Sequence, residues 1–153
     1  MGTTRAKAGS AEAFRKIDHD IVLEIAKTAK SSQVPYFSLV SAVGANKNSL
    51  FLYPQVKGQI EEAVLALQFK HCQIFRPACL VIDGGRGERR ILETMLHSVL
   101  SAFSWMSDSV DINVKALANV MVQQSLAALA GEKTSEILVN KEIVRIARQL
   151  GSK

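Results

Sequence analysis

A tyrosine and a lysine four residues apart, Tyr53 and Lys57, are the residues whose types and spacing best suit proton transfer. On a helix this spacing places the two side chains one turn apart on the same face. An ammonium group beside a phenol favours the phenolate, so we expect Lys57 to lower the pKa of Tyr53 towards neutral pH. Ser41 lies twelve residues upstream, at the end of a predicted strand, and its hydroxyl can hold a substrate carbonyl. Together these groups suit protonation of a carbonyl oxygen while a cofactor delivers hydride.

The same residues have a purely structural interpretation. Tyr53 is then a half-buried residue at a helix start with its hydroxyl in water, and Lys57 is an ordinary solvated lysine. A Tyr-x-x-x-Lys match arises readily by chance, so the spacing alone is a weak signal. The setting favours catalysis, because a strand, Ser41 and a glycine-containing loop precede the tyrosine at the start of a helix.

Histidine and cysteine offer little further chemistry. His19, His71 and His97 are far apart and have no carboxylate at ligand spacing, so no metal site is expected. Cys72 and Cys79 lack the spacing of a zinc site and are expected to be reduced thiols. His71 and Cys72 are adjacent on a predicted strand and point to opposite faces, so they do not form a nucleophile pair.

Length and composition indicate one ordinary globular domain. The chain has 153 residues, 48% of them hydrophobic and 22% charged, which excludes wholesale disorder. No apolar run approaches the roughly 18 residues of a transmembrane helix. The net charge is +5, but the basic residues are scattered apart from Arg86, Arg89 and Arg90, and aromatic residues make up only 6%. We therefore expect no direct binding to nucleic acid.

The N-terminus carries no clear targeting signal. Met1 and Gly2 open like a myristoylation site, but the motif requires Ser or Thr at position 6, where this chain has alanine. No apolar core of a signal peptide follows, and Glu12 and Asp18 argue against a transit peptide. The sequence predicts a cytoplasmic location, with the nucleus as a second one.

Helices and strands are predicted to alternate along the chain. Residues 1–10 are small and polar like a loop, and they end at Ser10, a predicted N-cap. Apolar residues then recur at helical spacing, at Phe14, Ile17, Ile21, Val22, Ile25, Ala26 and Ala29. The further elements expected are strands at 36–40, 73–75, 80–82 and 137–139, and helices at 53–67, 91–106, 114–129 and 141–150. This order predicts βαβ units and a mostly parallel sheet.

Three segments resemble one known family. They are Gly2-Thr3-Thr4-Arg5-x-Lys7-Ala8-Gly9, the stretch from Ser41 through Asn48-Ser49-x-Phe51-Leu52-Tyr53-x-Gln55-Val56-Lys57-Gly58, and Phe75-Arg76-Pro77. The chain resembles the Tat-interacting protein family of atypical short-chain dehydrogenases/reductases, known as NADPH-binding, metastasis-suppressing oxidoreductase-like proteins. The resemblance covers almost the whole chain and is strongest from Thr3 to Pro77.

The resemblance implies a site and a cofactor. The catalytic residues carried over are Ser41, Tyr53 and Lys57, and the implied cofactor is NADP. The implied cofactor-binding residues are Gly2, Thr3, Thr4, Lys57, Arg76 and Pro77, with the lysine on the nicotinamide ribose. Pro54 departs mildly from the family pattern, because it biases Tyr53 away from helical dihedrals and towards the helix cap.

The implied fold is the C-terminal part of a Rossmann-type doubly wound parallel sheet. In the family a strand, a G-x-x-G-x-x-G turn and a helix hold the pyrophosphate, and this chain begins where the fourth strand should end. About 90 residues, roughly three βα units, are thus expected to be missing, and residues 1–153 form a partial NAD(P)-binding domain. The turn at 84–87 (Gly-Gly-Arg-Gly) is interpreted as a solvated turn rather than a phosphate site.

Two functions follow as hypotheses. The first is NADP(H)-dependent oxidoreduction of an unidentified small-molecule carbonyl or alcohol. The alternative is a truncated, catalytically inactive interaction or regulatory protein related to transcription or nuclear transport. An open sheet edge and exposed apolar helix faces further predict that the chain is unstable alone, forms a homodimer or needs a protein partner.

Overall fold

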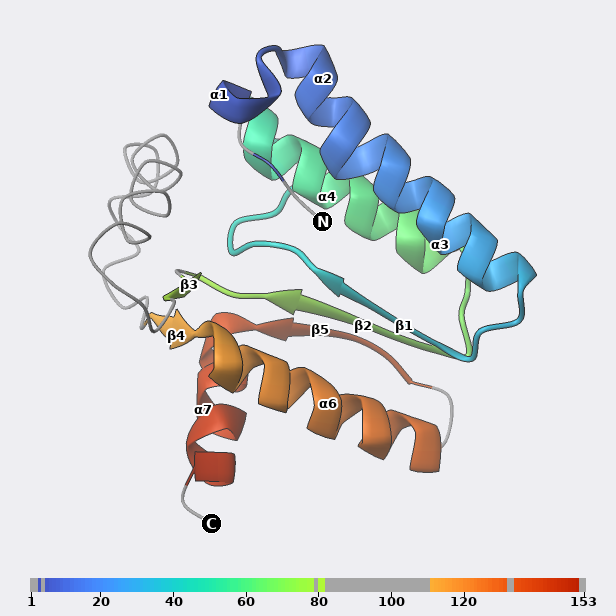
Figure 1. The fold of residues 1–153 in the computed structure, drawn as a ribbon, viewed down its shortest axis with the longest axis vertical. Coiled ribbons are helices and arrows are strands. Elements are labelled where there is room, and N and C mark those ends of the chain that lie inside the picture. Colours follow the sequence, from blue (N-terminus) through green and yellow to red (C-terminus); the bar gives the residue numbers. More distant parts are fainter. Residues whose placement is uncertain (1–2, 4, 79, 82–110, 132–133, 152–153) are drawn as a thin grey trace.

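The computed structural model describes residues 3, 5–78, 80–81, 111–131 and 134–151 and has three layers (Figure 1). The middle layer is a parallel sheet in the order β1 (Tyr36–Val40), β2 (His71–Arg76) and β5 (Thr134–Val139). The short strands β3 (Leu80–Val81) and β4 (Ile112–Asn113) form a separate parallel pair. The predicted mixed α/β class with parallel strands is confirmed, and it is consistent with part of a Rossmann-type fold.

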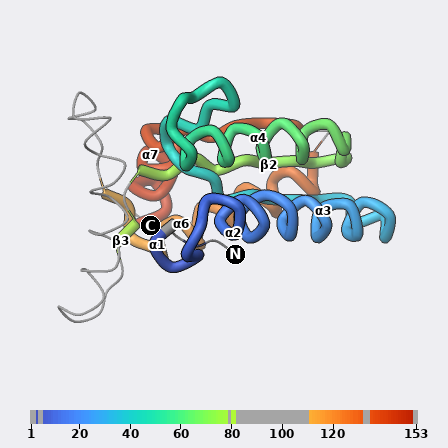
Figure 2. Tube along the Cα trace, turned by 90° about the horizontal axis from the view of Figure 1, so that it is seen from above, coloured from blue at the N-terminus to red at the C-terminus, as the bar shows by residue number. Residues whose placement is uncertain are grey.

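Helices cover both faces of the three-stranded sheet (Figure 1). One face carries α2 (Ala11–Arg15), the π-helical turn η1 (Lys16–Asp20) and α3 (Ile21–Ser31), which continue into one another, together with α4 (Leu52–Ala66). Figure 2 shows α3 and α4 running in the same direction along the sheet. The opposite face carries α6 (Val114–Ala130) and α7 (Asn140–Gly151).

The central strand β2 explains why the sheet needs both helical layers. Five of its six residues are buried, as expected for a parallel strand covered on both faces. Residues of one parity join the core beneath α3 and α4, which contains Val22, Ala26, Leu39, Ile60, Val64, Phe69, Cys72 and Ile74. Residues of the other parity face α6 and α7, where the core contains Phe75, Ile112, Leu117, Val120, Leu138 and Ile143.

Most of the predicted elements are found within a few residues of their expected bounds. Ser10 caps α2 as predicted, because its Oγ accepts a hydrogen bond from the amide of Ala13 at 3.0 Å. Three local features differ. Arg5–Ala8 forms a short helix, α1, where a loop was expected, the first long helix contains the π-helical turn, and the short strand β4 precedes α6 where no strand was expected. The helix expected at 91–106 and the turn at 84–87 lie outside the described residues.

No helix in the described part of the chain combines the length and hydrophobicity needed to cross a membrane.

Candidate functional site

Ser41 lies directly after β1, at the carboxyl end of the parallel sheet. Its amide extends the β1–β2 ladder by donating to the carbonyl of Phe75 at 2.7 Å. The residue is only 6% exposed, and its hydroxyl has no hydrogen-bond partner within the described residues. A buried hydroxyl without a partner costs about 1–3 kcal/mol, so this position favours an incoming ligand atom that accepts a hydrogen bond from the serine.

Tyr53 lies in the first turn of α4, and Lys57 follows one turn later. The N-cap of this helix is Phe51, whose backbone is extended, and the helix begins at Leu52. The expectation that Pro54 would move Tyr53 to the cap is therefore wrong. A proline in the first turn is tolerated, because the amides of that turn have no partner inside the helix. The carbonyl of Pro54 accepts a hydrogen bond from the amide of Asn46 at 2.9 Å, which ties the start of α4 to the preceding loop.

Gly58 allows this loop to pack directly on α4. A Cβ atom at position 58 would lie 2.2 Å from the amide nitrogen of Lys47 and 2.4 Å from the carbonyl carbon of Asn46. Both contacts are with backbone atoms, which cannot rotate away. The glycine that ends the family motif is thus needed for the close approach that positions Tyr53 and Lys57.

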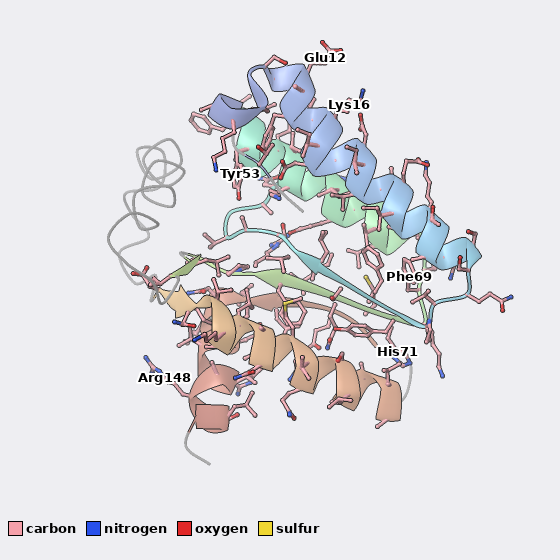
Figure 3. The ribbon with its side chains drawn as sticks, viewed as in Figure 1. Glu12, Lys16, Tyr53, Phe69, His71 and Arg148 are labelled. Atoms are coloured by element: carbon pink, nitrogen blue, oxygen red, sulfur yellow. The ribbon has the colours of Figure 1, made fainter. Side chains whose placement is uncertain are left out.

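The ring of Tyr53 has an aromatic ring and a cation as neighbours. Its centroid is 6.0 Å from that of Phe14 on α2, and the Nζ atom of Lys57 lies 5.8 Å from it over the ring. Figure 3 shows Tyr53 at the end of α4 that lies near α1 and α2. Tyr53 and Lys57 are therefore brought together as the spacing predicted, but the ammonium lies over the ring face.

A buried carboxylate engages the lysine. Lys57 Nζ donates to Oδ1 of Asp18 at 2.9 Å, and both residues are buried, at 7% and 1% exposure. The other carboxylate oxygen, Oδ2, accepts a hydrogen bond from the amide of Thr3 at 2.9 Å. Asp18 is thus the centre of a small polar cluster that includes Thr3, Lys57 and the tyrosine ring.

This cluster reverses the predicted effect on Tyr53. Burial of the phenol, and then the negative charge of Asp18, raise the pKa of Tyr53 to about 12. The prediction that Lys57 lowers it is wrong for the structure described, because the ammonium is paired with a carboxylate and lies over the ring. Tyr53 is accordingly protonated at neutral pH and can act as a proton donor.

Sequence reasoning missed Asp18 as a functional residue, although a signal was present. The buried residues of α2, η1 and α3 are Phe14, Asp18, Val22 and Ala26, each four residues after the last. The predicted stripe omitted Asp18 and included Ile25, which is 48% exposed. A carboxylate within an apolar stripe at helical spacing would have indicated a buried, paired charge.

Only some of the cofactor-binding residues implied by the family resemblance lie within the described residues. Gly2 and Thr4 lie outside the described residues, whereas Thr3 joins the Asp18 cluster. The guanidinium of Arg76 makes two hydrogen bonds to Glu61 on α4, at 2.9 and 2.5 Å. Pro77 is buried at the same sheet edge as Ser41, and its carbonyl accepts from the amide of Val43 at 2.9 Å.

The remaining candidates lie in the core. His71 and Cys72 are both buried in β2, and burial raises the pKa of the Cys72 thiol to about 11. A thiol of this kind is a poor nucleophile, because the reactive form is the thiolate. Within the described ranges, no group of three or more His, Cys, Asp or Glu side chains is suited to holding a metal ion. Cys79 and His97 lie outside those ranges.

Comparison with known proteins identifies related sequences, although no family model matches the chain. The chain is 37% identical over 158 residues to "Protein FMP52, mitochondrial" of Coccidioides immitis, covering 97% of this chain and 63% of that protein. It is 36% identical over 150 residues to "Protein HTATIP2" of Rattus norvegicus, covering 97% and 60%. It is 33% identical over 159 residues to the FMP52 protein of Candida albicans, covering 98% and 67%. The chain thus spans about three fifths to two thirds of the length of these curated relatives.

The same relatives contradict the predicted cytoplasmic or nuclear location. FMP52 proteins of Coccidioides immitis, Scheffersomyces stipitis, Candida albicans and Aspergillus fumigatus are all named mitochondrial. The predicted location rested on the absence of an obvious targeting signal in the first residues of this chain. Such an absence does not identify a compartment.

Proposed function

The chain belongs to the family of atypical short-chain dehydrogenases/reductases that includes HTATIP2 and the FMP52 proteins, and on that premise we propose that it carries the catalytic residues of an NADP(H)-dependent carbonyl reductase. The proposed catalytic residues are Ser41, Tyr53 and Lys57. The proposed substrate is a small molecule with a carbonyl group, or the corresponding alcohol in the reverse direction.

The observation that carries this proposal is the buried hydroxyl of Ser41 at the carboxyl end of β1, which has no hydrogen-bond partner in the described part of the chain. In open α/β sheets, ligands bind outside the carboxyl ends of the strands. A substrate carbonyl oxygen that enters this edge would accept the Ser41 hydrogen bond and satisfy the hydroxyl. Tyr53, on the helix that follows, would then donate its proton to the same oxygen.

The protonation state of Tyr53 agrees with this role. With its pKa raised to about 12, the phenol keeps its proton throughout the neutral range. The alkoxide that forms on reduction of a carbonyl is a stronger base than a phenolate, so proton transfer from Tyr53 is favourable. Lys57 Nζ lies over the ring of Tyr53 and is paired with Asp18, so the lysine is held beside the reacting tyrosine.

The site also has groups that suit the nicotinamide end of a cofactor. Bound NADPH supplies the hydride that adds to the carbonyl carbon. Lys57 is the proposed partner of the ribose hydroxyls, and Thr3 and Pro77 are proposed to line the same end together with Gly2 and Thr4. Because the guanidinium of Arg76 is bound by Glu61, we propose that Arg76 contributes backbone atoms rather than its charge.

We further propose that the protein acts in mitochondria. The support is the printed names of the FMP52 relatives, which are called mitochondrial. Detection of the endogenous protein in purified, protease-treated mitochondria tests this location.

The test of the function is NADPH binding followed by turnover of a panel of aldehydes and ketones. Calorimetric titration of the purified protein with NADPH should give saturable binding. Replacement Tyr53→Phe should leave this binding in place and lower turnover by at least about 100-fold. Tyr36→Phe is the matched control, since the other tyrosine of the chain lies on β1 and hydrogen bonds to Gln73.

Two outcomes would overturn the proposal. Absence of NADPH binding removes the cofactor and favours the alternative of an interaction protein. Binding with full turnover by the Tyr53→Phe variant removes the tyrosine as proton donor.

A further inference from the structure

Asp18 is the most buried charged side chain of the described residues, and both of its oxygens are used. Oδ1 accepts from Lys57 Nζ and Oδ2 accepts from the amide of Thr3, each at 2.9 Å. Asp18 itself is 1% exposed. A carboxylate is rarely buried to this extent without a partner, because the loss of hydration must be offset by charge-assisted hydrogen bonds.

The backbone around Asp18 is also unusual. The residue lies in the π-helical turn Lys16–Asp20, between two regular α-helical segments. Single π-helical turns within α-helices are often found at functional sites, since they redirect side chains relative to the helix face. Here Asp18 reaches α4 at Lys57, 39 residues away in sequence, and also the N-terminal segment at Thr3.

We propose that Asp18 is a positioning residue of the site, which holds Lys57 over the Tyr53 ring and joins the Thr3 segment to the catalytic pair. The proposal rests on the proposed function, because it assigns a task to Lys57 and Tyr53. It extends that function, since the family resemblance assigned the serine, the tyrosine and the lysine but no carboxylate. Asp18 touches neither substrate nor cofactor in this role and acts through the lysine.

The ion pair has a measurable electrostatic consequence. With Asp18 charged, the lysine charge is compensated, and phenolate formation at Tyr53 is opposed by both burial and the nearby carboxylate. In an Asp18→Asn variant, the ammonium is uncompensated and the negative charge is gone. Both changes favour the phenolate, so the pKa of Tyr53 must fall.

Three other charged groups near these helices have hydrogen-bonding partners of their own. Arg15 on α2 donates to Gln55 and Gln59 on α4. Arg76 on β2 is held by Glu61. Asp20 pairs with His19 on the outer side of the π-helical turn, and Asp20 is exposed. In the described residues, Asp18 is therefore the group whose removal changes the charge beside Lys57.

The composition of the chain makes a direct experiment possible. There are two tyrosines, so in a Tyr36→Phe background the near-ultraviolet absorbance of phenolate reports Tyr53 alone. Asp18→Asn in this background should lower the Tyr53 titration midpoint by about one pH unit. Asp20→Asn, a loss of the same charge two residues away on the exposed side, is the matched control and should leave the midpoint unchanged. An unchanged midpoint in Asp18→Asn, or an equal shift in Asp20→Asn, would overturn the proposal.

A second measurement needs no replacement of Asp18. Nitrogen-15 NMR of lysine ammonium groups detects those that are buried and hydrogen bonded, because their protons exchange slowly with water. The otherwise unaltered protein should show such a signal near neutral pH, and Lys57→Arg should remove it. If no slowly exchanging ammonium is seen, Asp18 does not hold Lys57 in a buried ion pair and the proposal is refuted.

Neither measurement requires cofactor or turnover, so both are independent of the enzyme hypothesis. If NADPH binds, Asp18→Asn should weaken its binding and change kcat, whereas Asp18→Glu should partly restore both. If NADPH does not bind but the Tyr53 titration midpoint shifts as expected in Asp18→Asn, the proposed function is refuted and the proposed role of the ion pair stands.

Discussion

The chemistry of the site depends on single polar groups and how each is satisfied. Among the residues that the structure describes, the buried hydroxyl of Ser41 has no hydrogen-bond partner, whereas the buried ammonium of Lys57 has one. The serine is thus open to a ligand, and the lysine is held in place before any ligand arrives. A residue kept in an unfavourable state in the free protein is a common feature of sites that bind and react.

Replacement Ser41→Ala should therefore lower activity without lowering stability. It removes an unpartnered buried hydroxyl, so the free energy of unfolding should be unchanged or rise by about 1 kcal/mol. Turnover should fall, because the substrate oxygen loses a hydrogen bond. Chemical denaturation and steady-state kinetics measure the two effects. Ser125→Ala is the control, since that serine is half-buried on α6 and its hydroxyl donates to the carbonyl of Val122. A loss of stability in Ser41→Ala would contradict the assignment.

The raised pKa of Tyr53 predicts the pH dependence of carbonyl reduction. The proton donor is present below its pKa and is lost as the pH rises through it, and that pKa is about 12. Single-turnover reduction should therefore show no loss assigned to Tyr53 between neutral pH and about pH 10, the ordinary tyrosine value. A falling limb with a midpoint near neutral pH, absent in Tyr53→Phe, would contradict this and support the original expectation of a lowered pKa.

At the scale of elements, the approach of α4 to the preceding loop decides where the catalytic pair lies. Gly58 has no room for a side chain, because the backbone of Asn46 and Lys47 crosses it. The amide of Asn46 is bonded to the carbonyl of Pro54 at the same helix. Backbone contacts thus hold the loop that follows Ser41 against the helix that carries Tyr53.

Replacement Gly58→Ala should disrupt this packing of the loop on α4. The new Cβ atom meets backbone atoms at 2.2 and 2.4 Å, so the loop must move, at a cost of about 1–3 kcal/mol in unfolding free energy. Activity should fall with it. Gly151→Ala is the matched control in α7, where nothing lies within 4 Å of the added atom. Thermal denaturation distinguishes the two variants. The control should be neutral or slightly stabilising, and equal melting temperatures of the two variants would argue against close packing of the loop on Gly58.

At the scale of the whole molecule, apolar side chains remain on the outer surfaces of the helices. On α6, Val122, Leu126 and Leu129 are 56%, 57% and 50% exposed and share one face by their spacing. On α3, Ile25 is 48% exposed. This stripe supports the prediction from sequence that the chain does not behave as a stable, isolated monomer.

Sedimentation velocity and calorimetry test that prediction. The chain should self-associate or melt at low temperature with poor cooperativity, and Leu126→Lys should reduce any self-association. Ala127→Lys is the control, because this exposed position on α6 is neither three nor four residues from Val122, Leu126 or Leu129. A monodisperse monomer with a cooperative melting transition would refute the prediction.

The amino-acid sequence was sufficient for the α/β class, the family and most of the helices and strands, because periodicity, caps and motifs are local patterns. It also determined that Tyr53 and Lys57 share a helix face, since four residues make about one turn. Tertiary structure alone decided the state of these groups. Lys57 meets Asp18 across 39 residues, and Thr3 joins them across a further 15. Such pairings, and the burial that raises the pKa of Tyr53, exist only once α4 packs against the first helix, and no local pattern encodes them.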